Sequence, residues 1–286
     1  MPAERPYVLG THDVEARRLG LQHRLWSATA HALWNRAGFG PGARLLDVGA
    51  GPGFASFDLA QIADGVRPDD VLLGSRGRVV AIDESARFVA QIVAGAAARG
   101  LPIRALQGDV QELSAVLARA GEPAGFDGAW IRWVLCFVPD PEAVIAGIAA
   151  NLRPGGRLVI HDYFNYEAMT LAPRGPAFTR VVQAVAASFR ARGGDPDIMG
   201  RVPAILARHG LHLLHLEVDQ RIVRPTEPLW AWPDSFFRNY VPALVEAGFL
   251  TRSEGEAWRE EWDDHIVRND GFALMPTVLG AVAERG

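Results

Sequence analysis

Two kinds of residue in this sequence are suited to holding a nucleotide-sized ligand: closely spaced glycines, and acids that follow apolar runs. Asp47 follows the apolar residues 45–46 and precedes Gly49, Gly51 and Gly53. Glycines lack a Cβ, so the backbone can pass close to a ligand. The helix expected after them directs its N-terminal N–H groups and the positive end of its dipole at the same space. This arrangement predicts a pocket at the carboxyl edge of an α/β sheet.

The spacing of the glycines fits the two commonest nucleotide motifs poorly. The dinucleotide motif G-x-G-x-x-G requires a glycine at position 54, where this sequence has Phe54. A phosphate-binding Walker loop requires Gly-Lys-Ser/Thr, and no lysine follows the turn. The pattern G-x-G-x-G therefore indicates another ligand, or a turn that holds none.

The elements needed to position these residues alternate between strands and helices. The expected strands in the first part of the chain are 44–48, 78–82, 103–106, 126–131 and 157–161. The expected helices are 12–38, 54–63, 86–99, 112–119, and one that Asp140 and Pro141 begin and that ends at 153–156. Such alternation predicts a parallel sheet with right-handed crossovers and helices on both faces.

The last third of the chain has a different pattern. Helices are expected at 176–192, 202–209, 230–247 and 253–267, and long strands at 211–223 and 272–282. We therefore expect one sheet whose last two strands are separated by a helical insertion.

Several separated segments resemble class I S-adenosylmethionine (SAM) dependent methyltransferases. Residues 45–53 resemble motif I of that family, residues 126–141 resemble motif IV, and residues 152–158 resemble a late turn with a structural role. The segments 193–197 and 233–237 resemble a bacterial branch that acts on small molecules. The resemblance implies a Rossmann-like, seven-stranded, mostly parallel sheet in a single domain, 1–286. Its expected parts are an N-terminal helical cap (1–40), a SAM-binding core (41–165), and a helical cap with the last two strands (166–286).

The resemblance also implies roles for the residues at the strand ends. Asp83 is expected to accept hydrogen bonds from the ribose hydroxyls, and Asp109 from the adenine amine. Ile131, through its carbonyl, and Arg132, through its charge, are expected to hold the methionine part of SAM, although Arg132 also suits a simple salt bridge. The full set expected to contact SAM is Tyr7, Gln22, Asp47, Gly49, Gly51, Asp83, Glu84, Asp109, Val110, Ile131 and Arg132.

Methyl transfer is an in-line displacement that depends on positioning, and an oxygen or nitrogen acceptor also needs a base. His161 follows the fifth strand and is the candidate general base, with Asp162 as its orienting carboxylate. Alternatively, the His161 side chain points to the other face of the sheet, or it lines the pocket without taking part in the reaction. Aromatic side chains near the site are the candidate acceptor contacts, namely Trp133, Tyr163, Phe164 and Trp230.

Composition limits the remaining classes of function. The formal net charge of −4, without a block of basic residues, argues against nucleic acid as a partner. The single cysteine, Cys136, and the lack of a 20-residue apolar run or a signal peptide indicate a cytoplasmic protein without a membrane partner. His212 and His215 fall on opposite faces of a strand, so no metal is expected.

These observations predict a SAM-dependent methyltransferase that acts on a small-molecule acceptor and releases S-adenosylhomocysteine. Two alternatives stay open: a methyltransferase acting on protein or RNA, and a SAM-binding protein without methyl transfer. The acceptor, the atom that is methylated and the oligomeric state do not follow from the sequence.

Overall fold

Short apolar segments of the chain pair into one large sheet. The computed structural model describes residues 13–65 and 76–286. The strand order is β3-β2-β1-β4-β5-β10-β7, in which the first five strands run parallel and β10 runs antiparallel to both of its neighbours. The bounds are β1 (Arg44–Val48), β2 (Arg78–Asp83), β3 (Ile103–Gln107), β4 (Phe126–Arg132), β5 (Leu152–Phe164), β7 (Leu211–Asp219) and β10 (Thr277–Arg285).

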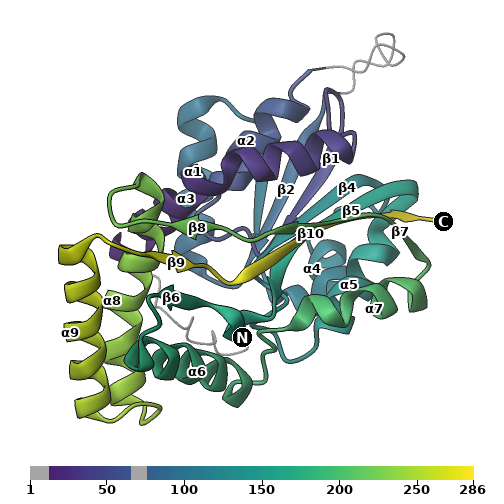
Figure 1. Ribbon diagram of the computed structural model, residues 1–286. Helices are drawn as coiled ribbons and strands as arrows, with labels where there is room; N and C mark the ends of the chain where they lie inside the picture. The colour runs from purple at the N-terminus through teal and green to yellow at the C-terminus, as the bar shows by residue number, and fades with distance from the viewer. Residues whose placement is uncertain (1–12, 66–75) are drawn as a thin grey trace.

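Helices cover both faces of this sheet (Figure 1). The helices α1 (Asp13–Arg36), α2 (Phe54–Ala63) and α3 (Ala86–Arg99) lie on one face, and α4 (Leu113–Arg119), α5 (Pro141–Asn151) and α7 (Val202–Arg208) on the other. Capping explains their predicted bounds. The side chains of Ser85 and Asp140 accept hydrogen bonds from first-turn amides of α3 and α5, and Gly100 ends α3 in the left-handed conformation.

A second layer of structure packs beside the main sheet. It contains α6 (Pro176–Ala191), α8 (Ala231–Glu246), α9 (Arg252–Arg268) and a three-stranded antiparallel sheet of order β6-β9-β8. The small strands are β6 (Thr170–Ala172), β8 (Ile222–Val223) and β9 (Phe272–Leu274). Short 3-10 turns complete the fold at η2 (Val110–Glu112), η3 (Tyr166–Ala168), η4 (Ile198–Gly200) and η5 (Pro228–Trp230).

The small sheet corrects the prediction of two long terminal strands. The expected strand 211–223 divides into β7 and β8, and the expected strand 272–282 divides into β9 and β10. Pro276 lies in the second break, where a residue without an N–H interrupts a ladder. The helical insertion between β7 and β10 is confirmed. In the described part of the chain, no helix is both long and apolar enough to cross a membrane.

Candidate functional site

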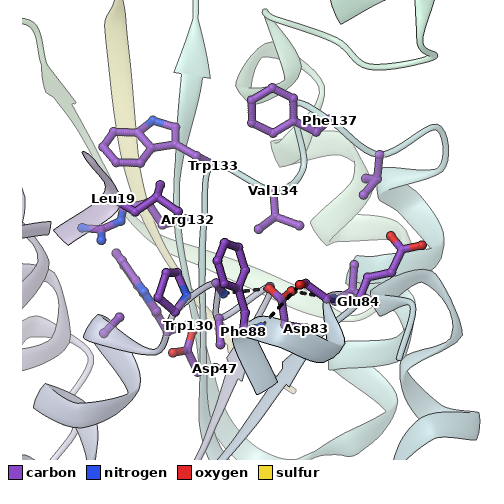
Figure 2. A pocket seen from close by; sticks show the side chains of 18 of the residues that line it. Leu19, Asp47, Asp83, Glu84, Phe88, Trp130, Arg132, Trp133, Val134 and Phe137 are labelled. Atoms are coloured by element: carbon purple, nitrogen blue, oxygen red, sulfur yellow. Dashed lines mark hydrogen bonds between the residues drawn. The ribbon is translucent and has the colours of Figure 1, made fainter. Parts of the chain in front are cut away.

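A cavity of about 560 Å³ lies at the carboxyl ends of β1, β2 and β4, with one side closed by α1 (Figure 2). It brings together most of the residues that the sequence predicts to contact SAM. Those that line it are Gln22, Asp47, Gly49, Gly51, Asp83, Glu84, Asp109, Val110 and Arg132. Tyr7 lies outside the described residues. Ile131 is buried in β4 and its side chain packs in the core, so a contact through its carbonyl stays a prediction.

The glycine turn between β1 and α2 needs glycine for two different reasons. Gly49, Gly51 and Gly53 have φ values of 71°, 54° and 86°, a region that other residues rarely adopt. A Cβ at Gly49 would also collide with Val134, whereas a Cβ at Gly51 would meet no atom within 4 Å. The turn is therefore tight against the protein at Gly49 and open at Gly51, on the wall of the cavity.

Backbone amides orient the two acids at the ends of β2 and β3. The N–H of Gly51 donates to Asp83 Oδ2 at 2.7 Å, and the N–H of Ser85 donates to Asp83 Oδ1 at 2.9 Å. The Gln111 N–H donates to Asp109 Oδ1 at 2.9 Å. Both carboxylates are thus held at neighbouring strand ends, on the same cavity.

Burial shifts the pKa values of two charged residues that line the cavity. It raises the pKa of Asp47 to about 6, although the Ser56 hydroxyl donates to this carboxylate at 2.5 Å. It lowers the pKa of Arg132 to about 10, which leaves the guanidinium charged at neutral pH. Arg132 Nη1 is buried and has no hydrogen-bond partner among the residues that the structure describes. Arg132 therefore lines the cavity with one N–H donor group unsatisfied within the described part of the chain.

Helix α1 is attached to the cavity by polar contacts. Arg132 Nη2 donates to Nδ1 of His23 at 3.2 Å, and Nε2 of the same ring hydrogen-bonds to Asp58 Oδ2 at 3.0 Å. Gln22 Oε1 accepts from Arg18 at 2.9 Å and from the Trp232 indole N–H at 3.0 Å. Gln22 therefore joins α1 to α8, two elements far apart in the sequence.

A second, smaller cavity of about 40 Å³ adjoins the first and is mainly aromatic. Gln22, Trp133, Phe137 and Phe189 line both cavities. The remaining aromatic residues of the small cavity are Tyr163, Tyr166, Trp232, Phe236 and Phe237. Of the predicted acceptor contacts, Trp133 thus lies where the two cavities meet, and Tyr163 lines the smaller cavity only.

His161 does not lie where a general base is expected. Its ring packs among Trp26, Trp130 and Trp133 at centroid distances of 5.5, 6.2 and 5.7 Å, and it lines neither cavity. Neither ring nitrogen has a hydrogen-bond partner within the described residues. Burial lowers its pKa to about 3, so the ring is a neutral, weak base. This placement contradicts the expectation that His161 faces the substrate.

The carboxylate of Asp162 makes other contacts than the predicted one with His161. It accepts hydrogen bonds from the backbone N–H groups of Val134, Cys136 and Tyr163, at 3.2, 3.3 and 2.8 Å. Adjacent residues of a strand point to opposite faces, so Asp162 cannot orient His161. It instead fixes the loop after β4, which forms a wall of both cavities.

Two further predicted acceptor contacts lie away from the cavities. Trp230 stacks on Trp262 at 4.6 Å and on His265 at 5.7 Å, inside the helical insertion. Phe164 is exposed near the end of β5 and lines neither cavity. Among the described residues, no three metal-binding side chains gather into a possible metal site.

The cavities also contain residues that sequence reasoning missed. The loop after β4 contributes Val134, Phe137 and Val138 to the cavity. Their position after the carboxyl end of a strand could have predicted that they line it. Phe189 comes from α6, whose sequence shows only an ordinary amphipathic pattern. No local signal distinguishes it from a core residue.

Comparisons with known proteins agree with this geometry. Residues 40–190 match a family model described as a methyltransferase domain. A methyltransferase named str2 from Strobilurus tenacellus is 30% identical over 198 residues, which cover 68% of this chain and 62% of that protein. A 2-phytyl-1,4-naphtoquinone methyltransferase from Synechocystis is 32% identical over 148 residues, covering 50% and 52% respectively. The matched region is thus less than two thirds of the length of these relatives.

Solved structures share the fold at lower sequence identity. A geranyl diphosphate C-methyltransferase from Streptomyces coelicolor has a TM-score of 0.52 at 18% identity, covering 92% of this chain and 80% of that one. A 4+2 cyclase has a TM-score of 0.53, also at 18% identity, covering 90% and 80%. At this identity the likeness concerns the fold and leaves the reaction open.

Proposed function

Since this chain belongs to the family of class I SAM-dependent methyltransferases, we propose that it transfers a methyl group from SAM to a small-molecule acceptor and releases S-adenosylhomocysteine. The observation that carries the proposal is the convergence of the glycine turn, Asp83 and Asp109 on one cavity of about 560 Å³. Ligand pockets commonly have volumes of about 300–1,000 Å³.

The residues around the cavity suit the three parts of SAM. Asp83 would bind the ribose hydroxyls, and Asp109 with the backbone of Val110 would bind adenine. Arg132, whose Nη1 has no partner among the described residues, would bind the methionine carboxylate. Gly51 would allow SAM to approach the backbone closely, because this residue has no side chain between its backbone and the cavity. SAM, when bound, supplies a methyl group activated by a positively charged sulfur.

The aromatic side chains shared by the two cavities support a small, apolar acceptor in the adjoining part of the larger cavity, since the smaller one, at about 40 Å³, has room for only a few water molecules. Trp133, Phe137 and Phe189 connect the two cavities, so an acceptor held there would lie beside SAM. Gln22 and Trp232 hold α1 against α8 over this space, which would exclude water during transfer. An enclosed acceptor site favours a small molecule over a protein or an RNA. The naphtoquinone methyltransferase among the relatives makes aromatic acceptors the first class to test.

Binding of the cofactor is tested by isothermal titration calorimetry with SAM, S-adenosylhomocysteine and NADH. We expect SAM and its product to bind and NADH not to bind. Asp83→Asn should weaken binding by about 10- to 100-fold, since a hydrogen bond to a charged group contributes about 1.5–3 kcal/mol. The matched control is Asp64→Asn, a surface acid paired with Arg76. Equal losses in both variants would contradict the assignment of Asp83.

Methyl transfer needs its own measurement, because a cyclase shares the fold. Radiolabelled SAM is incubated with a naphthoquinol, a phenolic acid, an aliphatic carboxylate, tRNA and a ribosomal fraction. We expect label transfer and S-adenosylhomocysteine only with small molecules. Transfer to tRNA or ribosomal protein would support the macromolecular alternative. SAM binding without product from any acceptor would support a SAM-binding protein of another function.

A further inference from the structure

Arg192 lines the larger cavity from the side of the helical insertion. It directly follows α6, and the residue as a whole is exposed, so it lies at the cavity opening. Phe189, one turn earlier, lines both cavities and packs edge-to-face on Phe137 with ring centroids 4.8 Å apart. The acids and Arg132 that are assigned to SAM come instead from the carboxyl ends of strands. Arg192 therefore lies on a part of the wall that the assigned cofactor contacts leave unused.

The backbone after Arg192 is fixed against the loop after β4. Gly193 has a φ of 84°, and a Cβ on Gly194 would collide with the carbonyl oxygen of Cys136. The Asp195 N–H donates to the same carbonyl at 3.0 Å. The two glycines thus allow this turn to approach the cavity wall closely, and the turn places Arg192 beside the cavity.

A buried phenol holds the side chain of Arg192. Its Nη1 donates to the hydroxyl of Tyr240 at 3.1 Å, and this hydroxyl also hydrogen-bonds to Ser188 at 2.9 Å. Tyr240 belongs to α8 and is 1% exposed. The guanidinium is therefore anchored between α6 and α8 instead of extending freely into water.

The charge of Arg192 has no carboxylate partner among the residues that the structure describes. The neighbouring arginines Arg180, Arg190 and Arg201 each form an ion pair with a carboxylate, at 2.7, 2.8 and 3.2 Å. A guanidinium has five N–H donors, of which the Tyr240 hydroxyl uses one. Arg192 thus provides a positive charge and hydrogen-bond donors next to the aromatic wall of the cavity.

We propose that Arg192 binds a carboxylate of the acceptor, and that the acceptor is an aromatic compound with one such group. The proposal rests on the proposed function, because it concerns the acceptor end of the same cavity. A guanidinium can bind a carboxylate through two parallel hydrogen bonds. The rings of Phe137 and Phe189 would contact the apolar body of the acceptor. One cation balances one negative charge, which favours a carboxylate over a phosphate ester with a charge of about −1.5 to −2.

Calorimetric titration of acceptor probes tests this assignment without requiring turnover. The probes are para-hydroxybenzoate, para-hydroxycinnamate and a hydroxynaphthoate, each compared with its neutral amide, on native protein saturated with S-adenosylhomocysteine. For at least one pair, the carboxylate should bind at least about fivefold more tightly than the amide, because only the charged group pairs with Arg192. If no carboxylate binds more tightly than its amide, the proposal is wrong.

Arg192→Gln should remove this preference. We expect the affinity for the carboxylate to fall by at least about fivefold, and the affinities for the amide and for S-adenosylhomocysteine to change by less than about twofold. The matched control is Arg180→Gln, which loses the same charge on the same helix, lines neither cavity and should keep the preference.

Two results with Arg192→Gln would overturn the proposal. A preference for the carboxylate that survives the change would show that another group binds it. An equal loss of affinity for S-adenosylhomocysteine would assign Arg192 to the cofactor. Circular dichroism shows whether each variant is folded, and the comparison of carboxylate with amide in the native protein needs no variant. A failure of methyl transfer itself would appear in the radiolabel experiment, which is independent of these binding measurements.

Discussion

Burial separates His161 from the cavity and determines its protonation state. The three tryptophans around the ring offer no hydrogen-bond acceptor, and the charge of Arg132 adds to the effect of burial. A protonated His161 would therefore be an unpaired buried cation, which is strongly unfavourable. The neutral ring fits the site because it behaves as a flat, largely apolar side chain.

His161→Leu should reduce the pH dependence of stability. The pKa of this histidine is about 3 in the folded protein and about 6.5 when unfolded, so its penalty is absent above pH 6.5 and grows as pH falls toward 3. At pH 5 the penalty is about 2 kcal/mol. Urea unfolding at pH 7 and pH 5 should show a fall in stability that is smaller by that amount in the variant. The raised pKa values of Asp47 and Asp162 act in both proteins and cancel.

The same variant tests the catalytic role. Loss of a general base lowers kcat by about 10²–10⁴-fold. We expect His161→Leu to keep kcat within about tenfold of the native value, because the ring lines neither cavity. A loss of a hundredfold or more, with SAM binding intact, would restore His161 as the base.

At the scale of elements, α1 is a cover attached at several points. His23 connects it to Arg132 and Asp58, and Gln22 connects it to Trp232 of α8. These contacts link an N-terminal helix to the sheet and to the helical insertion at once. The cavity is therefore closed on this side only when α1 packs against both the sheet and α8.

Gln22→Ala should loosen this cover. The change removes the acceptor of the Trp232 N–H and of Arg18, and a buried unsatisfied donor costs about 1–3 kcal/mol. We expect faster amide hydrogen exchange along α1 and weaker binding of S-adenosylhomocysteine by about 5- to 100-fold. Ser27→Ala on the same helix is the control, because its hydroxyl donates to the Arg24 carbonyl of the helix itself. If both variants behave alike, the contact with α8 does not hold the cover.

Across the whole molecule, an ion-pair cluster and the ligand cavity lie at opposite edges of the sheet. Glu122 lies at the amino edge and is almost fully buried, with Arg44, Arg78 and Arg104 at 3.0, 2.8 and 2.7 Å. The three arginines belong to β1, β2 and β3, so one carboxylate ties three strands together. The cavity lies at the carboxyl ends of strands, away from this cluster.

Glu122→Ala should therefore destabilise the fold without changing the site. Removing the carboxylate takes away the shared partner of three arginines, and because Arg78 and Arg104 are 40% and 46% exposed and can be hydrated, the cost should be about 1–2 kcal/mol. Denaturant unfolding measures that loss, and calorimetry below the transition should give an unchanged affinity for S-adenosylhomocysteine. Glu256→Ala, an exposed change on α9, should shift stability by less than about 0.5 kcal/mol. A weakened affinity in Glu122→Ala would show that the two edges are coupled.

Local signals explain which elements could be predicted from the sequence. The bounds of β1, α2 and α3 agree with the predicted ranges 44–48, 54–63 and 86–99, because glycines and a serine cap mark their ends. Pro276 marks the division between β9 and β10 in the sequence, whereas no proline divides β7 from β8, and only their pairing partners differ.

Spacing along the chain is enough to predict the sheet, the glycine turn and the acids at its strand ends, because it sets which residues reach the carboxyl edge. The face that each side chain occupies, and what packs against it, depends on the tertiary structure. His161 and Asp162 are adjacent in sequence, yet one enters a tryptophan cluster and the other holds the loop after β4. Phe189 and Trp232 reach the cavities from distant helices. Packing between remote segments depends on the shape of the whole fold, which no local pattern contains.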